Sequence, residues 1–408
     1  MTSRTLTGRI PELDGLRGIA IGLVMIQHFV VGTGADAAPA TLLHYALKVC
    51  TLAWSGVDLF FVLSGFLIGG ILLDAKSSPT FFGTFYIRRA FRILPIYALL
   101  SAAPLLVAFA SPRWRDTACM AFGAPLPWYT SVFFVQNIWF AIRVNWGRIY
   151  LGATWSLAVE EQFYLTLPLL VRKVSTRALL ILSLITIVSA PLIRPISARF
   201  VGHYAPYTLV TSRADALMYG VLVAILVRKT GTSNVLGRHT RALLTTFAAL
   251  LGTMLLVFIK RGWNQESVAM NTVGYSAIAA FYCCLLLLAI APVDNPFRVL
   301  LRSKPLTKLG TVAYCVYLIH SPLLDGIYYL FERRTPRLLT FADFAPWSLS
   351  LALTFVVASI SWRYFEQPLI AVGHSFRYKA LSVAGVDIES KWTALKRDNR
   401  VEITESPQ

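Results

Sequence analysis

An arginine and a histidine, Arg17 and His28, lie in the first apolar stretch of the chain, LDGLRGIAIGLVMIQHFV. Eleven residues separate them, about three α-helical turns, so the two side chains share one helix face roughly 16 Å apart along the axis. Charge within a lipid-spanning helix is costly and normally faces a protein interior or a water-filled cavity. An arginine can bind an anion, and an imidazole can move a proton or accept an acyl group. The pair therefore predicts two contacts with one substrate, an arginine near its entrance and a histidine deeper in the membrane. An arginine at the membrane edge and a structural histidine would give the same spacing.

A second group of cations follows in FYIRRAFRILPIY, where Arg88, Arg89 and Arg92 occupy one segment. Arg88 and Arg92 are about one helical turn apart and can face the same way. Guanidinium groups bind phosphate oxygens through paired hydrogen bonds, so the cluster suits a phosphate-bearing donor. A positively charged anchor at the cytoplasmic surface is the alternative reading. Because loop charge puts Arg17 at the same membrane face, the sequence favours several arginines around one cytoplasmic opening.

Carboxylates and hydroxyls occur in two further apolar segments. The stretch GVDLFFVLSGFLI carries Asp58 and Ser64, and WSLAVEEQFY carries Glu160 and Glu161. Adjacent carboxylates cannot share a helix face, so one glutamate is expected to face inward and the other an interface. A carboxylate in a water-poor site can take part in proton transfer. Asp58 fits either contact with a substrate hydroxyl or pairing with an arginine.

Two late segments add a histidine and a carboxylate. YLIHSP places His320 near the middle of an apolar run, and FEQP places Glu366 at the end of the last one. Pro322 frees a backbone carbonyl of its helix, so His320 also fits a structural role. Glu366 can neutralise the arginines at the opening. The remaining candidate substrate contacts lie within the segments already quoted: Trp155 and Ser156 begin WSLAVEEQFY, and Tyr317 begins YLIHSP.

The elements that position these residues are membrane helices. Hydrophobic residues make up 56% of the 408 positions, charged residues 14%, and the mean hydropathy is +0.62. Soluble domains carry about 25% charge, so the composition predicts an all-α polytopic membrane protein embedded in a lipid bilayer. Ten apolar runs approach the length of a crossing; they are 16–34, 56–73, 92–110, 153–171, 178–195, 207–227, 242–259, 273–292, 310–330 and 347–365.

The distribution of charge gives the orientation. With a cytoplasmic N-terminus, inside loops hold most of the lysines and arginines that make the net charge +18. The short segment 128–142 contains Gln136 and Asn137, and counting it as a span would reverse everything after it, so we predict a re-entrant or interfacial segment. The first run is predicted to be an uncleaved span. Residues 1–375 are predicted to form one integral-membrane domain, and 376–408 a polar cytoplasmic tail.

Other function classes receive little support. The basic residues form no stripe with interleaved aromatics, so nucleic acid binding is not expected. The five cysteines show no metal-site or disulfide spacing and are expected to be small buried hydrophobes. A transporter or flippase for an anionic or lipid-linked sugar is the strongest alternative, with arginines on phosphate and histidines as proton relays. Inverted sequence repeats are missing, which argues against it.

Taken together, these segments resemble the bacterial membrane-bound acyltransferase family 3, which includes the O-acetylases of O-antigen, peptidoglycan and exopolysaccharide. The resemblance covers about residues 10–370. Six fragments occur in the family's order: LDGLRGIAI with its later histidine, GVDLFFVLSGFLI, FYIRRAFRILPIY, WSLAVEEQFY, YLIHSP and FEQP. It implies a bacterial inner-membrane enzyme that transfers an acyl group, usually acetyl, from cytoplasmic acyl-CoA to a hydroxyl of a saccharide or glycoside.

The resemblance also implies roles for particular residues. Arg17 and His28 match the family element that engages the donor and handles acyl transfer, and Arg89 and Arg92 match its second arginine motif. Acyl-CoA would be a co-substrate, with no metal and no permanently bound cofactor. Some members carry an extracytoplasmic esterase-like domain for which this sequence has no room, so either a relay of the acyl group needs a separate extracytoplasmic protein or transfer is direct.

These observations combine into one mechanistic hypothesis. The arginines, Arg88 included, would hold the phosphates of CoA, and His28 would act as general base or as acyl carrier. Glu160 and His320 are the further catalytic candidates. The predicted substrate contacts are Asp58, Ser64, Trp155, Ser156, Glu161, Tyr317 and Glu366.

Overall fold

The computed structural model describes residues 10–34, 47–48, 50–110, 112–143, 148–229, 232–261, 266–293 and 295–379. This part of the chain is helical, apart from one isolated bridge between Ala124 and Ile149. The elements are α1 (Pro11–Ile26), η1 (Gln27–Val31), η2 (Thr51–Ser55), α3 (Gly56–Asp74), α4 (Phe81–Ala110), α5 (Pro112–Phe122), α6 (Trp128–Val132), α7 (Gln136–Ala141), η3 (Gly152–Thr154), α8 (Trp155–Lys173), α9 (Thr176–Phe200), α10 (Ala205–Thr208), α11 (Val210–Leu226), α12 (Thr232–Arg238), α13 (Thr240–Arg261), η4 (Met270–Gly274), α14 (Tyr275–Ile290), α15 (Pro296–Leu301), α16 (Lys304–Glu332), η5 (Phe341–Asp343), α17 (Phe344–Ser361), η6 (Trp362–Glu366) and α18 (Gln367–Ser375).

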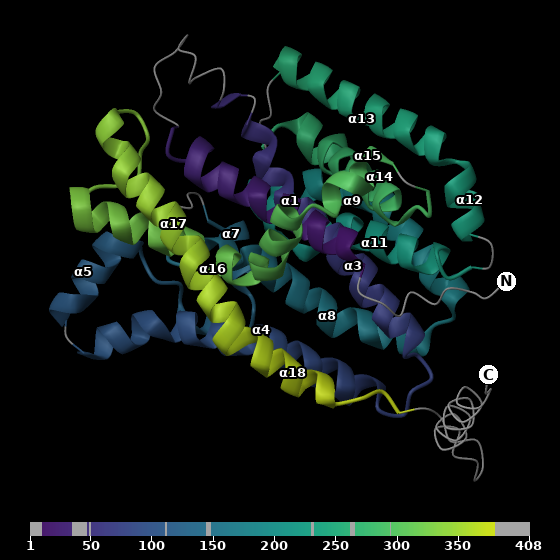
Figure 1. Ribbon diagram of the computed structural model, residues 1–408, viewed down its shortest axis with the longest axis horizontal. Helices are drawn as coiled ribbons and strands as arrows, with labels where there is room; N and C mark the ends of the chain where they lie inside the picture. The colour runs from purple at the N-terminus through teal and green to yellow at the C-terminus, as the bar shows by residue number, and fades with distance from the viewer. Residues whose placement is uncertain are drawn as a thin grey trace, which may run out of the picture.

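Seven helices in the described residues are long and apolar enough to cross a membrane, which confirms an all-helical, multi-pass membrane protein. They are Pro11–Val31, Thr51–Asp74, Thr176–Phe200, Ala205–Leu226, Thr240–Val257, Met270–Ile290 and Phe341–Ser375. The other three runs predicted to span are α4, α8 and α16, whose 30, 19 and 29 residues are also sufficient in length. In the ribbon diagram α13 lies at one edge of the bundle and α5 at the opposite edge, with α1 and α3 between them (Figure 1).

Helices α1 and α16 are held at unusually close range by glycines. A Cβ on Gly18 would lie 2.2 Å from the carbonyl oxygen of Leu306, and one on Gly310 would lie 1.9 Å from that of Asp14. Small residues at helix contacts let two backbones touch, which is how membrane helices gain packing energy without a hydrophobic driving force. The contact sets the helix that carries Arg17 and His28 directly beside the helix that carries His320.

The segment 128–142 is not a span. It forms the two short helices α6 and α7, of five and six residues, in agreement with the predicted re-entrant or interfacial segment. Its amides are buried: Gln136 Nε2 donates to the Tyr97 hydroxyl at 3.1 Å, and the side-chain amides of Asn137 and Gln162 bond to each other at 2.9 and 3.2 Å. Burial raises the pKa of nearby Tyr150 to about 12, and its hydroxyl donates to the Leu100 carbonyl. These bonds attach the segment to α4 and α8.

The predicted tail falls mostly outside the described residues. Helix α18 ends at Ser375, and residues 376–379 continue without helical structure. Residues 380–408 are not among those described.

Candidate functional site

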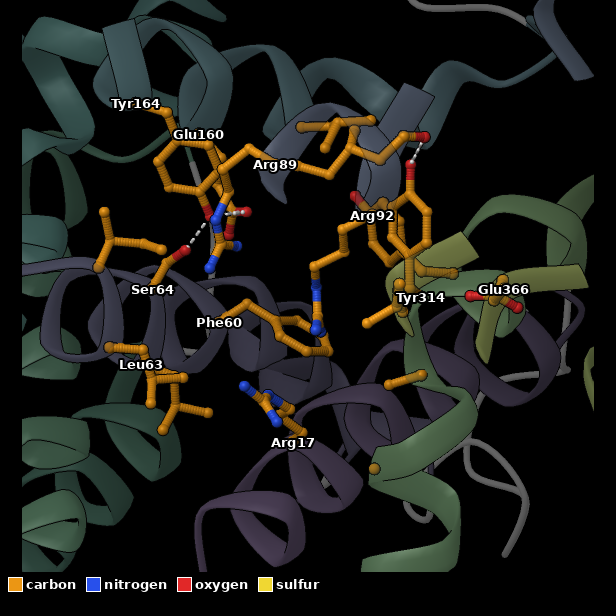
Figure 2. A pocket seen from close by; sticks show the side chains of 18 of the residues that line it. Arg17, Phe60, Leu63, Ser64, Arg89, Arg92, Glu160, Tyr164, Tyr314 and Glu366 are labelled. Carbon is orange, nitrogen blue, oxygen red and sulfur yellow. Dashed lines mark hydrogen bonds between the residues drawn. The ribbon is translucent and has the colours of Figure 1, made fainter. Parts of the chain in front are cut away.

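Three arginines and two glutamates meet around one cavity of about 140 Å³ between α1, α3, α4, α8, α16 and η6. Arg17 reaches it from α1, Arg89 and Arg92 from α4, Glu160 from α8, and Glu366 from η6. Figure 2 shows the three guanidinium groups pointing into the same space from different sides, with Arg92 between the other two. We call this space the arginine cavity. Residues separated by more than 300 positions thus form one cluster, and its three arginines are among those that the loop charges placed at one opening.

The cations of the arginine cavity are not all neutralised by the protein. Arg17 Nη1 donates to Asp14 Oδ1 at 2.7 Å, which is an ion pair within the first turns of α1. The Arg89 guanidinium carbon lies 5.5 Å from the centre of the Tyr164 ring. Within the described part of the chain, neither Arg89 nor Arg92 forms an ion pair. Both side chains are half-buried, and Glu160 and Glu366 share the cavity with them without a direct ion pair in the described residues, so the two guanidinium groups keep donors available for an anionic ligand.

A chain of hydroxyls ends at Glu160. The Tyr164 hydroxyl donates to Glu160 Oε2 at 2.8 Å, and Ser64 forms a short hydrogen bond with the same tyrosine oxygen (Figure 2). Because the tyrosine proton is used toward Glu160, Ser64 must be the donor in the second bond. The chain fixes the Glu160 carboxylate at the cavity wall, beside the arginines of α4.

The inner wall of the arginine cavity is made by Tyr317 and Ser156. The Tyr317 hydroxyl donates to the Ala153 carbonyl at 2.5 Å, and the Ser156 hydroxyl bonds the same phenol oxygen at 2.6 Å. The Phe60 ring packs on Tyr317 at 6.3 Å between centres. These contacts hold the Tyr317 ring between the arginine cavity and the residue one turn further along α16, His320.

His28 and His320 face each other beyond this wall. Their ring centres are 4.7 Å apart, with planes at 62°. His320 Nδ1 lies 2.8 Å from the Tyr317 carbonyl and 3.1 Å from the Val316 carbonyl. Carbonyl oxygens only accept hydrogen bonds, so Nδ1 carries the proton and Nε2 holds a lone pair. Among the described residues this buried Nε2 has no hydrogen-bond partner, so its lone pair is free to accept a hydrogen bond.

Two π-helical turns place site residues. The turn η1 contains His28 and is closed by a bond from the Gly32 amide to the Gln27 carbonyl at 2.8 Å. The turn η6 interrupts the long helix from α17 to α18 and contains Glu366, whose Oε1 accepts from Ser361 at 2.9 Å. A π turn adds one residue to a helical turn and is frequent at functional sites. The extra residue in each π turn changes the direction in which the side chain points from its helix, that of His28 in η1 and that of Glu366 in η6.

Four residues expected at the site do not line the arginine cavity: Arg88, Glu161, Trp155 and Asp58. Arg88 donates to the Phe376 carbonyl at 2.8 Å and so ties α4 to the end of α18. Glu161 does not line the arginine cavity, which agrees with only one of the adjacent glutamates facing inward. Trp155 packs on the Tyr207 ring at 4.5 Å, away from the cavity.

Asp58 belongs to a separate buried charge cluster that the sequence reasoning missed. It pairs with Arg213 of α11, and Arg194 of α9 pairs with Asp215 of α11. The Ser276 hydroxyl also donates to Asp215 Oδ2 at 2.6 Å. Charged residues inside apolar runs were the available signal, since such residues almost always pair within a membrane bundle. The cluster joins α3, α9, α11 and α14.

No metal site is evident in the residues that the structure describes, where no three His, Cys, Asp or Glu side chains are grouped to hold an ion. The ligand-binding features of the site are its cations, its hydroxyls and the two imidazoles.

Comparison with known proteins gives a family match over most of the chain. The acyltransferase domain of acyltransferase family 3 matches residues 10–364. The peptidoglycan O-acetyltransferase OatA of Listeria monocytogenes is 26% identical over 405 residues, which cover 90% of this chain and 57% of OatA. The putative peptidoglycan O-acetyltransferase YrhL of Bacillus subtilis is 26% identical, over 89% of this chain and 55% of its own length. The chain thus spans little more than half the length of these curated relatives. No solved structure matches it significantly.

Proposed function

Because this chain belongs to acyltransferase family 3, we propose that it transfers an acetyl group from acetyl-CoA to a hydroxyl of a cell-surface saccharide. The observation that carries the proposal is the convergence of Arg17, Arg89 and Arg92 on one cavity, with two of these cations unpaired in the described residues and the histidine pair beyond the cavity wall. The names of the relatives point to peptidoglycan or a related wall polymer as the acceptor.

The arginines would hold the diphosphate of the donor. Guanidinium groups bind phosphate oxygens in charge-assisted pairs, and such bonds are stronger where water is excluded. With phosphate at the arginine cavity, the flexible arm of CoA would extend past Tyr317 toward the histidines. The expected orientation, with both termini in the cytoplasm of a bacterium and the protein in its inner membrane, puts the arginines on the side where acyl-CoA is made.

The histidine pair would supply the base. In the reaction the acceptor O–H bond breaks, its oxygen attacks the thioester carbonyl, and the CoA thiolate leaves and takes up a proton. His28 would accept the hydroxyl proton, and His320, with its lone pair on Nε2, would orient the His28 ring and share that proton. The Glu160 carboxylate would balance the positive charge of the arginines after CoA and its phosphates have left the cavity.

The test is acetyl transfer by purified protein in lipid nanodiscs. Release of CoA from acetyl-CoA would be followed by chromatography rather than by a thiol reagent, because Cys50 and Cys119 are partly accessible free thiols. We expect release that depends on a saccharide acceptor, and its loss in His28→Ala. Release from wild type without any acceptor, in an amount equal to the enzyme and absent from His28→Ala, would show that the acyl group passes through His28. Uptake or flipping of a sugar without CoA release would refute the proposal.

A further inference from the structure

A larger hollow lies next to the arginine cavity, between α16 and the long helix that runs from α17 to α18. Its volume is about 790 Å³, and we call it the α16–α17 groove. Lys308 lines it from α16, and Phe355, Trp362 and Arg363 line it from the opposite helix. Figure 1 shows α16 beside α17 along this side of the bundle.

The groove and the arginine cavity share a wall. Thr311 and Trp362 line both spaces. Thr311 lies between Lys308 and Tyr314 on α16, and Trp362 begins the π turn that carries Glu366. A long ligand that passes between these two side chains would therefore touch both spaces at once.

The charge of the groove is not balanced by the protein. Lys308 and Arg363 are exposed, and neither forms an ion pair in the described residues. A third hollow, on the other side of Arg17, contrasts with this: its cations are Arg17 and Arg228, which are paired with Asp14 and Asp74. Two unpaired cations beside aromatic side chains suit a ligand with a phosphate and a planar ring.

We infer that the α16–α17 groove binds the 3′-phosphoadenosine end of the acyl donor. This inference rests on the proposed use of acyl-CoA. Lys308 and Arg363 contact the 3′-phosphate, and Trp362 offers an aromatic face to the purine. The diphosphate reaches the arginine cavity past Thr311. The groove therefore makes the protein selective for CoA over thioesters of carriers that have no 3′-phosphate.

The test compares the binding of CoA and of 3′-dephospho-CoA, by calorimetry, to protein in phosphatidylcholine nanodiscs. The variant is Lys308→Ala/Arg363→Ala. Its matched control is Lys304→Ala/Arg377→Ala, which removes the same charge from exposed positions that do not line the groove. A charge-assisted contact to phosphate corresponds to about tenfold in affinity. Wild type and control should prefer CoA by about tenfold or more, and the variant should bind both compounds equally.

The same pair of variants separates binding from chemistry. With acetyl-CoA the groove variant should show a KM raised about tenfold, at an unchanged kcat, because it keeps the arginine cavity and the histidines. A Lys308→Met/Arg363→Met protein, which keeps the side-chain volume, should behave in the same way and checks against misfolding. Equal binding of the two compounds by wild type, or an undiminished preference for CoA in the groove variants, would overturn the inference.

Two further outcomes have distinct meanings. If the groove variants differ from wild type only after phosphatidylglycerol is added to the nanodiscs, the groove is a lipid site and the inference fails. If wild type neither binds CoA nor transfers acetyl from acetyl-CoA, the proposed function itself fails, and this result does not resemble either of the others.

Discussion

The role of Asp58, which the sequence leaves open, can be tested by Asp58→Asn. The sequence left open whether this carboxylate contacts substrate or pairs with an arginine, and the structure pairs it with Arg213. Both side chains are 1% exposed. The change removes one negative charge and almost no volume, so any effect on stability reports the ion pair rather than packing.

The expected loss in the free energy of unfolding follows from the groups that remain around Arg213 after the change. Its Nε and Nη1 atoms already have no hydrogen-bond partner in the described residues, and Asp215 is occupied by Arg194 and Ser276. The Tyr275 ring, 4.4 Å from the guanidinium carbon, gives only partial compensation. Breaking a buried pair by removing one partner costs about 3–5 kcal/mol, because an uncompensated charge stays buried. We therefore expect Asp58→Asn to lose about that much of the free energy of unfolding.

The assay is thermal unfolding of detergent-purified protein, followed by size-exclusion chromatography. Asp74→Asn is the control, since Asp74 pairs with Arg228 at a more exposed site where an ion pair is worth about 0–1 kcal/mol. A double variant, Asp58→Leu/Arg213→Met, should recover most of the lost stability because neither charge remains. If Asp58→Asn unfolds like wild type and instead raises the KM for the acceptor, the structural role is refuted and the substrate role stands.

Three other changes test the site and its scaffold. His320→Gln should lower kcat by about 10²–10⁴, the usual contribution of a positioned base, with donor KM unchanged; a normal kcat in steady-state assays would exclude His320 from the chemistry. Arg92→Gln should weaken CoA binding about tenfold or more by calorimetry, since it removes a charge-assisted phosphate contact; equal affinity would mean that phosphate binds elsewhere. Gly310→Ala should lower thermal stability by about 1–3 kcal/mol, because its Cβ would lie 1.9 Å from the Asp14 carbonyl oxygen; an unchanged unfolding temperature would show that α1 and α16 can separate freely.

The sequence predicted most of the arginine cavity because few environments accept a permanent charge in a membrane. Arg17, Arg89 and Arg92 had to face an interior or an opening, and the positive-inside rule put them at one face. Glu366, at the end of the last apolar run, was expected to neutralise these arginines, whereas Glu160 was expected as a catalytic residue and not at the opening. The structure places both glutamates at the same cavity as the three arginines.

Partners that are distant in the chain could not be predicted in the same way. Nothing local to Asp58 distinguishes a substrate hydroxyl from the guanidinium of Arg213, which is 155 positions away. The Arg88 side chain points toward the end of α18 because it donates a hydrogen bond to the Phe376 carbonyl, and nothing local to Arg88 indicates that partner. The π turns at His28 and Glu366 were not predicted either, because no residue type in these stretches marks the turn that takes up an extra residue.

The separation of arginines from histidines has a physical consequence for catalysis. A neutral imidazole loses little solvation energy when it is buried, whereas a guanidinium needs a counter-charge or water. The histidine pair can therefore lie inside the bundle behind Tyr317, while the arginines stay in the cavity that the groove adjoins. Phosphate bound near the histidines would favour the imidazolium and remove the base, so the distance between the two groups protects the lone pair that the proposed reaction needs.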